Sequence, residues 1–252
     1  MTKGLGVAGI TGRMGRLLAE EILAAGATFS GGSSRNPAAG AAFADTASLA
    51  AACDVLIDFT HASQVAAHAQ AVLAAGCAWV LGTSGLSASD EAAVREAASQ
   101  VAVVYAPNFS PGVNLALALA ERMAAALPPE DYDAEIVEMH HRQKVDAPSG
   151  TAIGLGRAVA KGRGVRLEDV IESGRDGHTG PRKTGAIGFA ALRGGQVVGE
   201  HSLIFAAGTE HITLTHRAFD RRAFATGAVR AALWVRGRTP GLYSMLDVLG
   251  MA

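Results

Sequence analysis

The sequence predicts an α/β protein with a Rossmann-like parallel sheet in its first part and a mixed sheet in its second part. Three observations support this fold class. Short apolar runs alternate with helical patterns before Pro107, and glycine turns join them. After Pro107, strand-like runs follow one another with few helices between them. The run Ala223–Val235 then has helical spacing again and is expected to return to the first domain.

The first part is a series of predicted strands separated by helices. Strands are expected at Leu5–Ala8, Ala27–Gly32, Asp54–Phe59, Trp79–Leu81 and Val101–Tyr105. Apolar spacing indicates helices over Met14–Leu23, Val65–Ala75 and Ser89–Gln100, with Ser89 as the N-cap of the last. Strands joined in this way pair in parallel and are covered by helices on both faces.

The second part contains two predicted helices and several strands. The helices are expected at Asn114–Leu127 and Gly150–Lys161. The strands are expected at Asp133–Met139, Ala186–Leu192, Gln196–Phe205 and His211–His216. Successive strands without intervening helices indicate a mixed or antiparallel sheet.

Composition excludes several classes of protein. Apolar residues make up 49% of the 252 residues, 18% are charged, and the formal net charge is −1. That is enough apolar material for a core, and the charge argues against a nucleic-acid or membrane-surface partner. We expect no signal peptide, and the sequence has no apolar run of about 18 residues, so we expect a cytoplasmic protein without a membrane span.

The two cysteines do not indicate a metal site. Cys53 and Cys77 lie in alanine-rich apolar surroundings, and the chain has no CxxC spacing or zinc-like Cys/His pattern. Both are expected to pack as small apolar side chains in a reducing compartment.

A glycine-rich turn follows the first strand and opens the first helix. It reads Gly9, Ile10, Thr11, Gly12, Arg13, Met14 and Gly15, with the spacing GxxGxxG. Glycine suits a sharp turn where backbone approaches a pyrophosphate, and the helix start directs N–H groups at it. A tight turn without a ligand is the alternative, but the position of the turn in the alternating pattern favours dinucleotide binding.

The end of the second strand favours NADPH over NADH. The sequence there is Ser33, Ser34 and Arg35, and no carboxylate follows until Asp45. An NAD site usually has an acidic residue for the ribose, whereas serines and an arginine suit a 2′-phosphate. The alternative is that Arg35 is a solvated loop cation.

Two further turns are expected at the same edge of the sheet, because both follow predicted parallel strands. Phe59 and Thr60 end the third strand there. These turns are expected to line the nicotinamide ribose and ring, with ordinary turn chemistry as the alternative. Their residues are Gly82, Thr83, Ser84 and Gly85, and Ala106, Pro107, Asn108 and Phe109.

A cluster of His140, His141 and Lys144 supplies general acids and a cation within five residues. Adjacent histidines on an extended segment point in opposite directions, so we expect different roles for them. A metal site is not expected, because the segment lacks a suitable third ligand. The alternative is a surface loop in which the histidines have no role.

The same segment continues into a predicted helix start. Ser149 is the expected N-cap, and the N–H groups of Gly150 and Thr151 would form a site for a carboxylate. Together with the cluster, this cradle indicates reduction of a polar anionic substrate.

With these motifs, the chain resembles the 4-hydroxy-tetrahydrodipicolinate reductase (dihydrodipicolinate reductase) family over essentially its whole length. The HHxxKxDAPSGTA pattern is the most specific part of the resemblance. The segments that carry it are VAGITGRMG (7–15), DFT (58–60), GTSG (82–85), APNFSPGVN (106–114), EIVEMHHRQKVDAPSGTA (135–152), GEHSLIF (199–205) and residues 212–234.

The resemblance implies a dinucleotide-binding domain of residues 1–110 and 219–252, and a substrate-binding and oligomerisation domain of residues 111–218. It implies a homotetramer formed through the second sheet. The implied reaction is reduction of a cyclic dicarboxylate by NADPH or NADH in lysine and diaminopimelate biosynthesis, giving tetrahydrodipicolinate and water.

Residue roles are also implied by the resemblance. His140 matches the family's proton donor and acceptor, Lys144 its second proton donor, and His141 a substrate-binding residue. Gly150 and Thr151 match the carboxylate site. Positions 9–14, 82–84 and 106–109 match cofactor contacts, and Arg35 matches the position that meets the 2′-phosphate.

One departure from the family's pattern concerns cofactor choice. Members that use NADH well often have an acidic residue just before the arginine, where this chain has Ser34. Two other functions remain open from the sequence. One is a different Rossmann-type amino-acid or semialdehyde dehydrogenase, and the other is a regulator that binds NAD(P)H without turnover.

Overall fold

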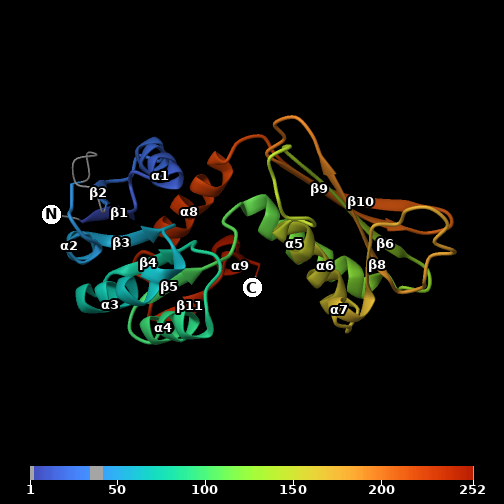
Figure 1. Cartoon of the computed structure of the whole chain (residues 1–252). Helices are drawn as coiled ribbons and strands as arrows, with labels where there is room; N and C mark the ends of the chain where they lie inside the picture. Colours follow the sequence, from blue (N-terminus) through green and yellow to red (C-terminus); the bar gives the residue numbers. More distant parts are fainter. Residues whose placement is uncertain (1–2, 35–41, 252) are drawn as a thin grey trace. The chain divides into compact units, whose positions relative to one another are not determined.

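The computed structural model describes residues 3–34 and 42–251. The chain divides into two compact units, one of Met1–Pro111 with Arg222–Ala252 and one of Gly112–Arg221. Figure 1 shows that the chain leaves the first unit through helix α5 and re-enters it through helix α8. Within the described residues, every helix is too short or too polar to cross a membrane.

The first unit is built on a six-stranded sheet in the order β11-β5-β4-β3-β1-β2. All neighbouring strands in it are parallel, so their carboxyl ends share one edge. The strands are β1 (Gly4–Ala8), β2 (Phe29–Ser33), β3 (Cys53–Asp58), β4 (Ala78–Leu81), β5 (Ala102–Tyr105) and β11 (Gly241–Tyr243). This edge is where an open parallel sheet binds its ligand.

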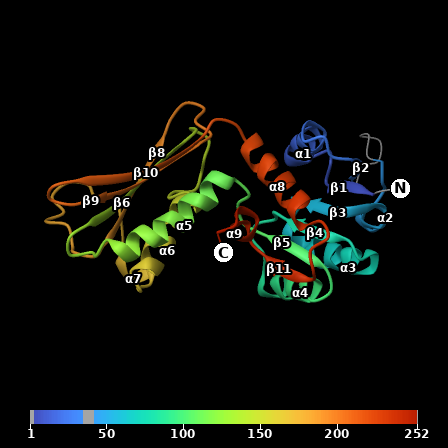
Figure 2. The same cartoon turned by 180° about the vertical axis from the view of Figure 1, so that it is seen from behind.

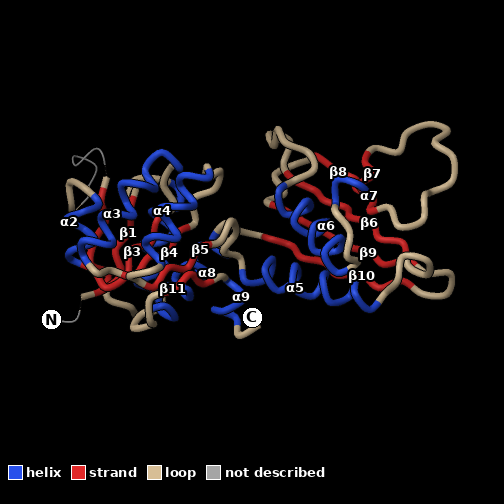
Figure 3. Tube along the Cα trace, turned by 90° about the horizontal axis from the view of Figure 1, so that it is seen from below, coloured by secondary structure: helices blue, strands red, loops and turns tan. Residues whose placement is uncertain are grey.

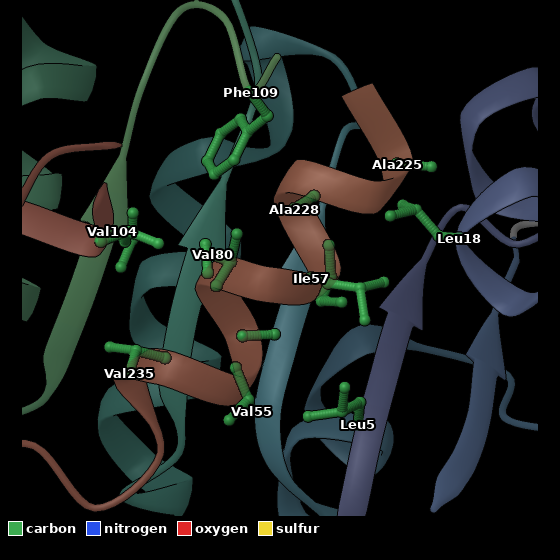
Figure 4. Close-up of a cluster of buried hydrophobic side chains, with 14 of the residues drawn as sticks. Leu5, Leu18, Val55, Ile57, Val80, Val104, Phe109, Ala225, Ala228 and Val235 are labelled. Atoms are coloured by element: carbon green, nitrogen blue, oxygen red, sulfur yellow. The ribbon is translucent and has the colours of Figure 1, made fainter. Parts of the chain in front are cut away.

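Helices cover both faces of this sheet, each over its own apolar core. On one face lie α1 (Arg13–Ala24), α8 (Arg222–Val235) and α9 (Met245–Leu249), which are labelled in Figure 2. Figure 4 shows Leu18 of α1 and Ala225, Ala228 and Val235 of α8 in the core on this face. On the other lie α2 (Thr46–Ala52), α3 (Val65–Ala75) and α4 (Ala88–Ala98). Val55 and Ile57 of β3 pack into the first core and Leu56 into the second. Burial on both sides explains why this strand is continuously apolar in sequence.

The second unit is built on a five-stranded sheet in the order β10-β9-β6-β8-β7, visible in Figure 3. Its strands are β6 (Asp133–His140), β7 (Ile171–Ser173), β8 (Ile187–Arg193), β9 (Gly199–Ala206) and β10 (His211–Ala218). β9 pairs antiparallel with β6 and β10, whereas β8 pairs parallel with β6 and β7. The sheet is therefore mixed, as predicted.

Helices α5 (Pro111–Ala126), α6 (Gly150–Gly162) and α7 (Leu167–Val170) pack on one face of the mixed sheet. The core between them contains Ile136 of β6, Leu203 and Phe205 of β9, and Leu155 and Val159 of α6. Strands β6 and β9 alternate strictly between buried and half-buried residues. Every second side chain of these strands therefore lies under the helices. The same alternation decides to which face the polar residues at the ends of the two strands point.

Some details of the sequence prediction are wrong, among them the start of helix α5, which is Pro111 and not Asn114. Helix α4 is capped by Ser87 and not Ser89, because the Ser87 hydroxyl accepts from Asp90 N and the Asp90 carboxylate accepts from Ser87 N in a capping box. The strand predicted from Gln196 begins at Gly199, because Gly195 adopts φ +52° and the chain turns there.

Several short elements were also missed. They are α2, β7, α7, β11 and α9. Each spans seven residues or fewer, which is too few for a clear hydrophobic period.

Candidate active site

The glycine turn in the first unit has the geometry that a dinucleotide requires. Gly9 adopts φ +73°, and a Cβ at Gly15 would lie 2.3 Å from the Gly9 carbonyl oxygen. Helix α1 can therefore begin directly against the turn only because Gly15 has no side chain. No side chain caps this helix at Gly12. Its first N–H groups are thus left for a ligand, as in phosphate-binding helix starts.

A cavity of about 910 Å³ opens beside this turn, entirely within the first unit. It is lined by Gly9, Thr11 and Gly12 of the turn, by Ser33 and Ser34 at the end of β2, and by residues of α2 and α3. The hydroxyls of Thr11 and Ser34 lie 3.1 Å apart and join the turn to the end of β2. The turn and the cavity together fit the phosphates and adenosine of a dinucleotide. Arg35, the predicted 2′-phosphate contact, lies outside the described residues.

The other predicted cofactor residues have different environments. Ile10 packs against Gly32, where a Cβ would come 2.5 Å from the Ile10 Cβ. Met14 packs on the core under α1, and Arg13 is exposed at the start of that helix.

The loops after β4 and β5 meet at the same sheet edge. The Thr83 hydroxyl donates to the Thr60 carbonyl at 3.3 Å, and the Phe59 and Phe109 rings pack edge to face at 5.3 Å. The Phe109 side chain is part of the core, and a Cβ at Gly227 would lie 1.8 Å from the Phe109 carbonyl oxygen. Helix α8 therefore packs directly against the backbone at Phe109. Gly82 and Ser84 belong to the neighbouring loop after β4.

In the second unit, a buried carboxylate organises the predicted catalytic segment. Glu138 is 1% exposed and lies on the helix-covered face of β6, two residues before His140. Its carboxylate accepts from Nδ1 of His140 at 2.6 Å and from the backbone N–H of Ser149 at 3.1 Å. Both guanidinium nitrogens of Arg193 donate to it at 2.8 Å. Four donors thus satisfy a charge that would be costly to bury alone.

These contacts keep Glu138 ionised. Burial by itself would raise the pKa of this carboxyl, but the hydrogen bonds from Arg193 and His140 outweigh it, and the pKa lies below its ordinary value. Arg193 also donates to the Asp146 carbonyl at 2.6 Å. It therefore holds the loop from His141 to Pro148 against the end of β6.

Ser149 joins this cluster to the start of helix α6. Its hydroxyl accepts from Ala152 N as the predicted N-cap, and it lies 2.8 Å from Nε2 of His201 on β9. The cap bond goes to Ala152, so the preceding N–H groups of Gly150 and Thr151 are not used by it. The neighbourhood of Gly150 is open, since a Cβ there would meet nothing within 4 Å. The carboxylate cradle expected at this helix start is sterically accessible.

His201 is a buried neutral histidine beside His140. The two rings lie 5.0 Å apart, edge to face. Burial, together with the nearby His140, lowers the pKa of His201 to about 4. His201 therefore offers no charge at neutral pH, and its contact with Ser149 joins β9 to the helix start.

Lys144 and His141 lie in the loop after β6. Nζ of Lys144 contacts both carboxylate oxygens of Asp146, at 2.8 and 2.9 Å. Nδ1 of His141 is buried and has no hydrogen-bond partner in the described chain. The structure thus brings His140, Ser149 and the helix start together around Glu138, and it pairs Lys144 with Asp146.

Sequence reasoning assigned no role to Glu138, Arg193 or His201. Two of them could have been found from the sequence. Glu138 and His201 are polar residues at the buried positions of alternating strands, where an unpaired charge would be unfavourable. Arg193 gave no such indication, since it comes directly after the predicted strand Ala186–Leu192, where a surface cation is common.

Comparisons with known proteins agree over the whole length of the chain. Residues 3–109 match the family model "Dihydrodipicolinate reductase, N-terminus", and residues 112–249 match "Dihydrodipicolinate reductase, C-terminus". The chain belongs to the dihydrodipicolinate reductase family. It is therefore an oxidoreductase of a family that uses nicotinamide dinucleotides.

Individual relatives in the dihydrodipicolinate reductase family are close. The 4-hydroxy-tetrahydrodipicolinate reductase of Granulibacter bethesdensis is 70% identical, over 98% of this chain and 97% of the relative. That of Gluconacetobacter diazotrophicus is 62% identical over the same shares. The structure of dipicolinate-bound dihydrodipicolinate reductase from Paenisporosarcina sp. TG-14 matches with a TM-score of 0.77 and 25% identity, over 98% of this chain and 99% of that one.

Proposed function

We propose that this protein reduces 4-hydroxy-tetrahydrodipicolinate to tetrahydrodipicolinate with release of water, in diaminopimelate and lysine biosynthesis. The observation that supports the proposal is the cluster around Glu138, whose carboxylate binds both His140 and the N-cap residue Ser149 of an open helix start, with Lys144 in the loop between them. Relatives that bear this activity in their names match nearly the whole chain. Binding of dipicolinate to a structural relative supports a small cyclic dicarboxylate as substrate.

The helix start at Gly150 and Thr151 would hold a substrate carboxylate by its N–H groups. His141, in the loop between His140 and Lys144, is assigned to substrate binding. Ser149 keeps the helix start in place through Glu138 and His201.

Proton transfer is assigned to His140 and Lys144. Because the Glu138 carboxylate takes the Nδ1 hydrogen, proton exchange at His140 occurs at Nε2. Both carboxylate oxygens of Asp146 hold the Lys144 ammonium in the loop after β6, and this group would donate the second proton. A bound nicotinamide dinucleotide supplies the hydride.

We further propose NADPH as the favoured cofactor, with NADH also accepted. The end of β2 presents the hydroxyls of Ser33 and Ser34 to the cavity, and a carboxylate for the ribose hydroxyls is absent from both positions. Asp45, which also lines the cavity, has one oxygen engaged with Ser48 N as the N-cap of α2. Hydroxyl donors suit a 2′-phosphate.

A homotetramer formed through the mixed sheet is part of the proposal. The face of that sheet opposite the helices presents Val137, Leu192 and Ile204, and Leu192 is 50% exposed. Apolar residues on an open sheet face favour association between copies. Light scattering coupled to size-exclusion chromatography would give four times the chain mass.

The decisive experiment is a steady-state assay on the product of the preceding synthase reaction, with NADPH and NADH in turn. Oxidation of the cofactor that depends on this substrate is expected, with the lower KM for NADPH. Activity on aspartate semialdehyde instead would indicate another dehydrogenase. Cofactor binding without turnover on either substrate would indicate a regulator.

A further inference from the structure

A hydrogen-bonded chain of side chains crosses the wall of the cavity in the first unit. Asp58, at the end of β3, is fully buried, and its Oδ2 lies 2.7 Å from Nδ1 of His68 on α3. Nε2 of His68 lies 3.0 Å from Oγ1 of Thr46, at the start of α2. The Thr46 hydroxyl in turn lies 3.3 Å from Oγ of Ser33, at the end of β2. The chain thus runs from a buried carboxylate to the β2 end, where dinucleotide folds meet the adenosine ribose.

Both ends of this chain are fixed. Oδ1 of Asp58 accepts from the N–H and the hydroxyl of Thr60, so Asp58 acts as an acceptor. Its partner Nδ1 on His68 must therefore carry hydrogen. At the other end, the Ser33 carbonyl accepts from the N–H groups of Gly9 and Ile10 in the glycine turn. Ser33 itself lines the cavity.

The charge of His68 then sets the direction of the hydroxyls. In neutral His68, Nε2 is an acceptor, so the Thr46 hydroxyl donates to it and accepts from Ser33. Ser33 then offers only acceptor lone pairs to the cavity. In protonated His68, Nε2–H donates to Thr46, and Thr46 donates to Ser33. The Ser33 hydrogen is then released toward the cavity.

We propose that His68 is a positioning residue for cofactor choice, because its proton reverses the Thr46–Ser33 hydroxyls and makes Ser33 a donor to a 2′-phosphate or an acceptor from a 2′-hydroxyl. The inference rests on the proposed cofactor in this cavity. Preference for NADPH over NADH is therefore stronger when His68 carries a second proton than when it is neutral. A hydrogen bond to a charged group corresponds to a change in this preference of roughly tenfold or more.

Other titratable groups lie close enough to need a control. Asp58 of β3 contacts the His68 ring, while Asp45 at the start of α2 and His61 before α3 line the same cavity. The 2′-phosphate also titrates, near pH 6. A variant that breaks the chain while keeping every one of these groups separates their effects from that of the hydroxyls. Thr46→Val does so, since it removes one hydroxyl and little else.

The test is the dissociation constant of NADPH and of NADH for the full chain, measured by fluorescence titration between about pH 5.5 and 8. Over this pH range, the ratio of the NADH to the NADPH dissociation constant is expected to change by a factor roughly tenfold larger in the wild type than in Thr46→Val. Thr46→Ser, which keeps the hydroxyl, should follow the wild type. His68→Gln, which cannot take a second proton, should follow Thr46→Val.

If the ratio of the two dissociation constants changed equally with pH in the wild type and in Thr46→Val, the proposal would be overturned. Direct attraction between the imidazolium and the 2′-phosphate would then remain as the cause. Histidine 15N spectra of the protein without cofactor give a second readout. Neutral His68 should carry its hydrogen on Nδ1, and the opposite tautomer would contradict the chain as described. If neither cofactor bound at any pH, the proposed function itself would fail, which is a distinct result.

Discussion

The carboxylate of Glu138 and the imidazole of His140 face each other at 2.6 Å, two residues apart on one strand. They share a face because side chains of a β-strand alternate with a period of two. Their hydrogen bond fixes the His140 tautomer with hydrogen on Nδ1, which leaves Nε2 for proton exchange. A buried carboxylate that orients a catalytic histidine stabilises the imidazolium without itself taking up the proton.

Glu138→Gln should therefore lower kcat by about 10²-fold while the dissociation constant of NADPH stays near that of the wild type. The amide keeps the size of the side chain but removes the charge that orients and stabilises protonated His140. His140→Gln should lower kcat by a similar factor or more. Stopped-flow turnover and fluorescence titration would measure the two quantities.

Glu135→Gln is the matched control. Glu135 lies three residues earlier on β6, on the opposite face, where it binds Arg175 and Arg182. This control should keep the wild-type kcat. Loss of turnover in both variants alike would indicate a general disturbance of the strand and would contradict the orienting role.

The sequence predicted the parts of this site that depend on local pattern. Ser149 was expected to cap α6, and it does, because a hydroxyl before an apolar helical run satisfies the first N–H groups. The site's centre was not predicted, because the contact between Glu138 and Arg193 joins residues 55 apart in the chain. Such pairing depends on which strands become neighbours, and helices α6 and α7 and strand β7 lie between β6 and β8 in the chain.

The same limit applies in the first unit. The alternating pattern predicted its parallel sheet, and glycine spacing predicted the turn at Gly9. The strand β11 was missed, because its three residues acquire their role only by pairing with β5. Asp58 and His68 were each inside a predicted element, yet their contact appears only when α3 packs over β3.

Lys144→Ala should lower kcat by roughly 10²- to 10⁴-fold, the contribution typical of a general acid, with little change in NADPH binding. Its Nζ is held by Asp146 in the segment that forms the candidate site. Lys161→Ala is the matched control, because Lys161 pairs with Glu121 on an exposed helix surface. An equal loss of NADPH affinity in Lys144→Ala would place the lysine at the cofactor instead.

Ser149→Ala should raise the KM for the dicarboxylate and reduce stability by about 1 kcal/mol, the usual cost of losing an N-cap. The change removes both the cap of α6 and the contact with His201. Ser87→Ala removes an equivalent cap from α4 in the other unit. Denaturant unfolding should give comparable losses for the two variants, whereas KM should rise only for Ser149→Ala. A rise of KM in both, or in neither, would contradict the positioning of the carboxylate cradle by Ser149.

The buried His201 predicts a pH dependence of stability. Burial lowers its pKa from 6.5 to about 4 in the folded protein. The unfolded chain therefore takes up a proton at this residue first as the pH falls, and the native state loses stability between pH 6.5 and about 4, by up to about 3 kcal/mol from this residue. Above pH 6.5 both states are neutral here, and the effect vanishes. His201→Gln, which retains a donor toward Ser149, should flatten this part of the profile of unfolding free energy against pH. The exposed His211, changed in the same way on β10, should leave the profile unaltered. A His201→Gln profile as steep as that of the wild type would show that His201 takes up its proton as easily when folded as when unfolded.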